Sequence, residues 1–244
     1  QGDRRLQGHV LPDQCDHPSI HHVLLLDHSS SMSAPSPMPD DRDICASHPN
    51  RLGAALQCAL LYLKNRRQCA YDDIFTVIDF NHEVSEPAEE IRGRFDISSL
   101  SGKLKRLKAS GGTNFTKAFE AAIKAFKKHE ELSHRPVLLF ITDGEDSGFD
   151  GDIFKNYLEN RSARNLKSIM VHTVRISPNP LPIFQKIVDI AAKGVYRACE
   201  FARASSCETM MSMDALSNHH DQLSVTGVPR GGFMSASIVT GPGQ

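Results

Sequence analysis

The chain has 244 residues, of which 40% are hydrophobic and 23% are charged, and its formal net charge at pH 7 is −1. This length suits one large α/β domain with short extensions. A net charge so close to zero does not favour bulk attraction to nucleic acid or to an anionic membrane surface, and we expect neither as a partner. The sequence also lacks an apolar run near the roughly 20 residues that a membrane span needs.

The N-terminal residues and the cysteines bear on where the protein works. Residues 1–5 contain neither the apolar segment of a signal peptide nor an initiator methionine, so we expect the chain to be part of a larger polypeptide. Six cysteines without a C-x-x-C pair are unlike a disulfide scaffold in a chain of this length. They lie at Cys15, Cys45, Cys58, Cys69, Cys199 and Cys207. We expect these thiols to be reduced and the protein to be cytoplasmic.

A short apolar run that ends in polar residues organises the chain. Residues 23–26 are continuously apolar, which is typical of a central strand covered on both faces. Asp27 follows at the carboxyl end of this strand, where open α/β sheets place their ligands. Asp27, Ser29 and Ser31 form an Asp-x-Ser-x-Ser pattern and offer one carboxylate and two hydroxyls. Hard oxygens of this kind favour Mg²⁺ or Mn²⁺ over zinc or copper.

A long connection and a long helix come next. Residues 33–50 contain four prolines and leave from the face that holds Asp27, so this connection is either a recognition rim or a solvated insertion. From Arg51 the apolar residues recur at helical spacing, which predicts a long helix. The pattern then predicts a strand, an edge strand and a small helix, over residues 74–80, 84–91 and 100–107. Pro87 indicates the edge position, because proline cannot donate to a sheet ladder.

Two further segments supply oxygen ligands. Ser110-Gly111-Gly112-Thr113-Asn114 places the Thr113 hydroxyl before a second long helix, and the glycine pair allows close backbone approach. Residues 137–141 form a second apolar strand, which ends in Thr142-Asp143-Gly144. In the alternative interpretation these residues cap helices, and Thr113 caps the helix that follows it. Capping does not require an aspartate at the ends of two apolar strands.

The remaining segments complete an α/β pattern. Helices are predicted over 153–160, 181–192 and 208–223, and strands over 169–176 and 195–201. This alternation predicts a doubly wound, mostly parallel sheet with one short antiparallel edge strand and helices on both faces. We expect a lead-in segment over 1–21, a domain over 22–223 and a glycine-rich tail over 224–244 that begins a β-rich module.

In this order the three oxygen-bearing segments resemble the von Willebrand factor type A domain and its metal-ion-dependent adhesion site. The resemblance covers about residues 22–222. It implies that Ser29, Ser31 and Thr113 bind a divalent ion through their hydroxyls, while Asp27 and Asp143 hold it, often through water. It further implies that an Asp or Glu of a protein partner completes the coordination. His28 and Ser30 stand where the family often has an apolar residue and a glycine, and neither change removes a ligand.

Three functions follow from these observations. The resemblance favours a metal-dependent protein–protein interaction domain with Mg²⁺ or Mn²⁺ and an acidic partner. The alternative is a structural scaffold domain that does not depend on the metal. A magnesium-dependent phosphohydrolase with Asp27 as nucleophile is less favoured. Such phosphatases need a second aspartate two residues later, where this chain has Ser29, and we therefore expect no enzymatic activity.

Overall fold

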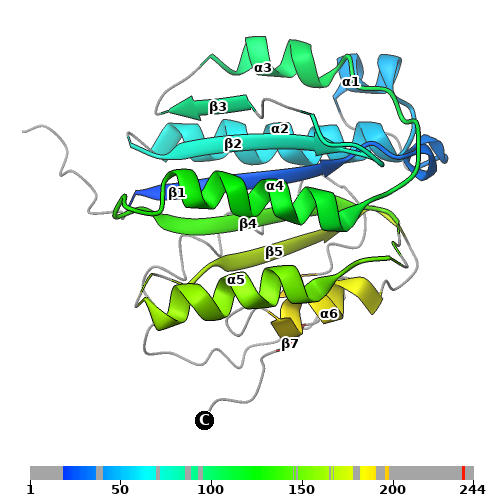
Figure 1. Cartoon of the computed structure of the whole chain (residues 1–244). Helices are drawn as coiled ribbons and strands as arrows, with labels where there is room; N and C mark the ends of the chain where they lie inside the picture. The colour runs from blue at the N-terminus through cyan, green and yellow to red at the C-terminus, as the bar shows by residue number, and fades with distance from the viewer. Residues whose placement is uncertain are drawn as a thin grey trace, which may run out of the picture.

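A five-stranded sheet forms the centre of the fold (Figure 1). The computed structural model describes residues 19–36, 41–69, 72–85, 89–92, 96–144, 146, 148–164, 166, 168–177, 182–190, 196–197 and 238–239. The sheet contains β1 (Ile20–Asp27), β2 (Ile74–Phe80), β3 (Glu89–Arg92), β4 (Arg135–Thr142) and β5 (Met170–Arg175). Their order is β3-β2-β1-β4-β5, and only the edge strand β3 pairs antiparallel with its neighbour. The predicted sheet, with its antiparallel edge strand, is therefore confirmed.

Helices cover both faces of this sheet. One face packs against α4 (Phe115–Lys128), α5 (Gly151–Ala163) and α6 (Pro182–Ile190). The other packs against the short 3-10 helix η1 (Ser30–Ser33) and the helices α1 (Arg42–Ser47), α2 (Arg51–Cys69) and α3 (Ile97–Leu104). In Figure 1, α4 and α5 lie in front of the sheet and α2 lies behind it. None of the described helices combines the length and apolarity needed to cross a bilayer.

The position of β1 at the centre of the sheet explains why its sequence is continuously apolar. Val23 and Leu25 belong to the core beneath α4, whereas Leu24 and Leu26 belong to the core beneath α2. Because successive side chains of a strand point to opposite faces, a strand covered on both faces must be apolar at every position. All four side chains are fully buried.

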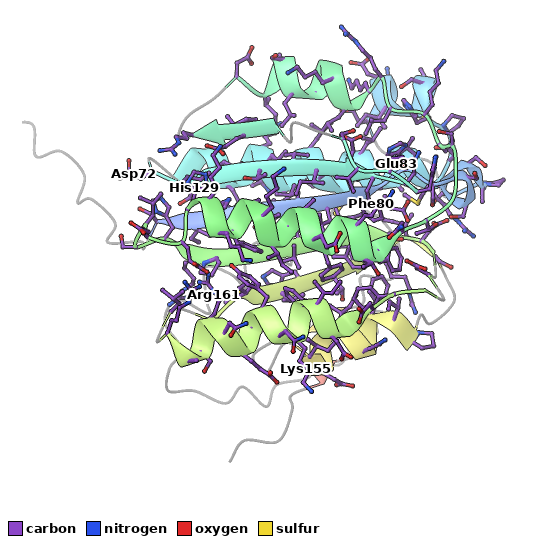
Figure 2. All side chains as sticks on the ribbon, viewed as in Figure 1. Asp72, Phe80, Glu83, His129, Lys155 and Arg161 are labelled. Atoms are coloured by element: carbon purple, nitrogen blue, oxygen red, sulfur yellow. The ribbon has the colours of Figure 1, made fainter. Side chains whose placement is uncertain are left out.

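A cluster of aromatic side chains packs between the sheet and the helices α4 and α6. Phe140 on β4 is fully buried, and four other rings surround it with centroid distances of 5.0 to 6.0 Å. These rings belong to Phe80, Phe115, Phe119 and Phe184. They come from β2, α4 and α6, so one cluster holds the sheet and two of its helices together. Phe80, a member of this cluster, is labelled in Figure 2.

Several element boundaries differ from the predictions. The strand β1 begins at Ile20, three residues before the apolar run. The connection over 33–50 contains α1, whose N-terminus is capped by the Asp41 carboxylate and whose Ile44 side chain is buried. Asn114, not Thr113, caps α4, because the Asn114 side chain accepts the backbone N–H of Lys117 at 2.9 Å. The capping interpretation of Thr113 is therefore wrong.

The C-terminal predictions are tested only in part. Within the strand predicted over 195–201, β6 (Tyr196–Arg197) pairs antiparallel with β7 (Ile238–Val239) of the tail. The helix predicted over 208–223, most of the lead-in segment and the rest of the tail lie outside the described residues. The domain boundaries and the β-rich module stay predictions.

Candidate functional site

The ends of β1 and β4 meet at the carboxyl edge of the sheet. These strands are neighbours, with Leu26 opposite Ile141, so Asp27 emerges beside Thr142 and Asp143. From β1 the sheet extends to β2 on one side and to β4 on the other, which makes this edge the topological switch point of the sheet. Open α/β sheets bind their ligands at such a point. In Figure 2, Glu83 lies in the turn after β2 at this edge, and Asp72, His129 and Arg161 lie at the opposite one.

Hydrogen bonds join four of the five predicted ligands. Asp27 Oδ1 accepts the backbone N–H of Ser29 at 2.7 Å, and the hydroxyl oxygens of Ser29 and Ser31 are 3.0 Å apart. The Ser31 hydroxyl donates to Asp143 Oδ1 at 2.8 Å, although 112 positions separate these residues in the chain. The other oxygen of Asp27 accepts the Thr142 hydroxyl. The carboxylates and hydroxyls are therefore oriented before any ligand binds.

The loop that carries Thr113 docks against the same turn. The backbone N–H of Ser30 donates to the carbonyl of Gly111 at 3.0 Å, and that of Ser110 donates to the carbonyl of His28 at 2.9 Å. Thr113 is half-buried, and its hydroxyl makes no hydrogen bond to another described residue. The structure thus brings Thr113 to the correct edge of the sheet without joining it to the hydrogen-bonded network.

Gly111 has a steric reason to be glycine. Its φ of 75° lies in the left-handed region, and a Cβ atom there would lie 2.3 Å from Nδ1 of His82. The close approach at Gly111 is therefore to the His82 side chain, and an approach of the glycine pair to an ion or ligand stays a prediction. Asn81 supports the same loop, because its side-chain amide donates to the carbonyl of Ser110 at 3.0 Å.

The two carboxylates of the site are buried. Asp27 is fully buried and Asp143 is 4% exposed. Burial raises the pKa of Asp27 above its ordinary value, and the nearby charge of Asp143 raises it further, whereas hydrogen bonds from Thr142 and Ser29 lower it. A cation bound between these carboxylates would offset their repulsion. The site therefore presents an electrostatic environment that favours a positive ion.

The side chains at this edge fit a hard divalent cation. Two carboxylates and the hydroxyls of Ser29, Ser31 and Thr113 are oxygen ligands of the kind that Mg²⁺ and Mn²⁺ prefer. At Gly144 a Cβ would lie 3.5 Å from the Ser31 hydroxyl oxygen and 3.8 Å from Asp27 Oδ2, so glycine keeps this space open. No group of three or more His, Cys, Asp and Glu side chains in the described part of the chain could hold a metal. Among the described residues, His, Cys, Asp and Glu side chains alone therefore do not form a metal site at this edge, and the hydroxyls would contribute to one.

Arg51 is a residue of this edge that no pattern in the sequence indicates as part of the site. Its Nη1 lies 2.7 Å from Asp143 Oδ2, and the Arg51 side chain is 23% exposed while that of Asp143 is fully buried. Arg51 is the first residue of α2 and follows the long connection over 33–50. The only signal in the sequence was that this connection leaves from the face that holds Asp27.

His28 ties the first turn to its neighbours. Its Nδ1 lies 3.1 Å from the carbonyl oxygen of Lys108, and its Nε2 lies 3.5 Å from Asp79 Oδ2 on β2. The imidazole therefore bridges the loop before α4 and the adjacent strand. In this chain the variable position between Asp27 and Ser29 has a positioning role.

The sequence of this chain matches the model of one protein family. A model described as the von Willebrand factor type A domain matches residues 22–145, which is more than half of the chain. The chain belongs to this family. The match contains Asp27, Ser29, Ser31, Thr113 and Asp143. Domains of the von Willebrand factor type A family commonly mediate protein–protein interactions.

Solved structures agree on the fold of this von Willebrand factor type A domain. A von Willebrand factor type A protein from Catenulispora acidiphila is 16% identical, with a TM-score of 0.57 over 81% of this chain and 42% of that chain. The conserved hypothetical protein BatB from Bacteroides thetaiotaomicron is 15% identical, with a TM-score of 0.57 over 82% of this chain and 100% of its own.

A third structure, the PilB minor pilin from Streptococcus sanguinis, is 9% identical, with a TM-score of 0.57 over 87% of this chain and 64% of that chain. Likenesses at these identities show the shared fold alone. This chain spans less than half the length of the Catenulispora protein. No curated protein matches the sequence significantly.

Proposed function

We propose that this domain binds a protein partner through a divalent cation held by Asp27, Ser29, Ser31, Thr113 and Asp143. The observation that carries the proposal is the hydrogen-bonded network that links two buried strand-end carboxylates through Ser29 and Ser31 at the switch point of the sheet. A bound Mg²⁺ or Mn²⁺ supplies a positive charge with an incomplete coordination sphere, which an Asp or Glu of the partner completes.

The residues of the chain orient these ligands and give a partner access to them. Asp27 is held by two donors, the Ser29 backbone and the Thr142 hydroxyl, so its carboxylate needs little rearrangement. The hydroxyls of Ser29, Ser31 and Thr113 are neutral, so that only Asp27 and Asp143 offset the charge of a cation in this ligand set. Ser30 and Ser31 are exposed, which leaves the turn open to a second protein. The family match supports an interaction role for this edge.

A scaffold role that does not depend on the metal is the second candidate. It is favoured by the ion pair at Asp143, because the Arg51 guanidinium already satisfies one oxygen of that buried carboxylate. In this case the carboxyl edge is structural, and partners bind elsewhere or without a cation.

Two serines of η1 allow a matched test. Ser31 belongs to the proposed ligand set, whereas the Ser33 hydroxyl donates to the carbonyl of Ser30 at 2.7 Å and lies outside the set. We expect Ser31→Ala to weaken Mn²⁺ binding, followed by electron paramagnetic resonance, by about tenfold or more. Ser33→Ala should bind Mn²⁺ like the wild-type protein.

Partner capture links the ion to function. The wild-type domain should retain partners from a lysate in Mg²⁺ and lose them in EDTA, and Asp27→Ala should not retain them in either condition. Capture of the same partners by both proteins in both conditions, together with no Mn²⁺ binding, would establish the scaffold role instead.

A further inference from the structure

Both oxygens of the Asp143 carboxylate are already occupied by groups of this chain. Oδ1 accepts the Ser31 hydroxyl at 2.8 Å, and Oδ2 pairs with Nη1 of Arg51 at 2.7 Å. A hydroxyl can donate to a carboxylate and still offer a lone pair to a metal ion. A guanidinium cannot, because it is permanently charged and has no acceptor atom.

The backbone holds Arg51 next to the turn that carries Ser31. The backbone N–H of Arg51 donates to the carbonyl of Ala34 at 3.0 Å, and Pro35 forms a β-bridge with Asn50. Ala34 directly follows η1, which contains Ser31. The start of α2 is thus fixed against the turn, so the guanidinium reaches Asp143 from a rigid element.

We propose that Arg51 is a tethered cation that competes with the divalent ion for Asp143 and thereby weakens metal binding. This inference rests on the proposed metal site. Without an ion, Arg51 compensates a fully buried carboxylate that would otherwise be unpaired at that oxygen. With an ion, two positive groups would share one carboxylate and repel each other, so the ion fills the site only by displacing the guanidinium from Asp143. Arg51 therefore sets the metal concentration at which the site fills.

Arg66 provides a matched control on the same helix. Its Nη2 lies 3.4 Å from Oδ2 of the buried Asp73, which also pairs with His22. Fifteen residues of helix separate Arg66 from Arg51, which corresponds to about 22 Å. At physiological ionic strength a charge at that distance is largely screened. Loss of the Arg66 charge should therefore leave metal binding unchanged.

The first experiment measures Mn²⁺ binding by electron paramagnetic resonance for the wild type, Arg51→Gln, Arg51→Lys and Arg66→Gln. Arg51→Gln keeps a hydrogen-bond donor for Asp143 but loses the charge, and it should bind Mn²⁺ about tenfold more tightly. Arg51→Lys and Arg66→Gln should bind it like the wild type. If Arg51→Gln binds Mn²⁺ no more tightly than the wild type does, the inference about Arg51 is overturned, while the proposed metal site stands. If no protein binds Mn²⁺, including Arg51→Gln, the proposed function fails as well.

A second measurement uses the wild-type protein and does not depend on how the variants fold. Phenylglyoxal modifies accessible arginines, and mass spectrometry locates each modified residue. Addition of MgCl₂ should increase the modification of Arg51 severalfold, because the ion releases it from Asp143, and should not change that of Arg66. If Mg²⁺ at concentrations that fill the site leaves the modification of Arg51 unchanged or reduces it, the two cations do not compete for Asp143.

Discussion

His21 should make the stability of the domain depend on pH near neutrality. It is 3% exposed on β1, its Nε2 lies 3.0 Å from the Thr76 hydroxyl oxygen, and its ring packs edge-on against Phe126 and His129. The pKa of His21 is lowered from 6.5 to about 3, chiefly by desolvation and also by the neighbouring imidazoles of His129, His22 and His134, against a smaller opposing effect of Glu90. The side chain is therefore neutral in the folded protein at pH 5 to 7.

The direction of the effect follows from proton linkage. Below pH 6.5 the unfolded chain binds a proton at His21, whereas the folded chain does so only near pH 3. The unfolded state is therefore favoured as the pH falls through this window. Between pH 7 and pH 5 this residue should remove about 2 kcal/mol from the free energy of unfolding. The unfolded-state pKa largely sets this value, because the folded-state pKa lies well below 5.

Urea unfolding at pH 7 and pH 5, followed by circular dichroism, measures this loss. His21→Gln removes the titration and retains an amide that can bond to Thr76. Between pH 7 and pH 5 the free energy of unfolding of the wild type should fall by about 2 kcal/mol more than that of the variant. His82→Gln, which removes an exposed imidazole, should behave like the wild type. Equal losses in the wild type and His21→Gln would refute the assignment of a neutral buried histidine.

Three substitutions test the packing that supports the site, each by urea unfolding. Gly53→Ala should destabilise the domain by more than about 3 kcal/mol, because its Cβ would lie 1.9 Å from the backbone oxygen of His48. Gly102→Ala in α3 meets no atom within 4 Å and should stabilise it by about 0.5–1 kcal/mol. If the two glycine changes altered the free energy of unfolding equally, the close contact between Gly53 and the His48 backbone would be contradicted. Phe140→Ala should cost about 3–5 kcal/mol, and a cost under about 1 kcal/mol would show that the ring cluster does not hold the sheet.

Local patterns were sufficient to predict the sheet and the carboxyl edge. Residues 23–26 and 137–141 are apolar at every position because both faces of each strand are covered. An aspartate one or two residues after such a run lies at the carboxyl end of its strand. Since both strands are parallel and adjacent, Asp27 and Asp143 had to meet at one edge. The ion and the acidic partner assigned to this edge remain predictions.

Element ends and short helices were harder to predict. The helix α1 has six residues, lies among prolines and buries only Ile44, so its apolar pattern is too short to detect. The sequence offers two adjacent residues, Thr113 and Asn114, as the cap of α4, and threonine and asparagine are both common caps. Which of the two caps the helix depends on the backbone angles of the loop, and the structure assigns this role to Asn114.

By itself, the sequence predicted the central strands, the longer helices α2 and α4, the positions of Asp27 and Asp143 at strand ends and the hydroxyl-bearing residues near them, because each of these depends on neighbours within a few residues. The ion pair between Arg51 and Asp143 joins residues 92 positions apart and was decided only by the tertiary structure. It exists because the connection over 33–50 folds back, so that Pro35 pairs with Asn50 and α2 starts beside the site. No spacing pattern encodes such a return, since it depends on contacts between residues far apart in the chain.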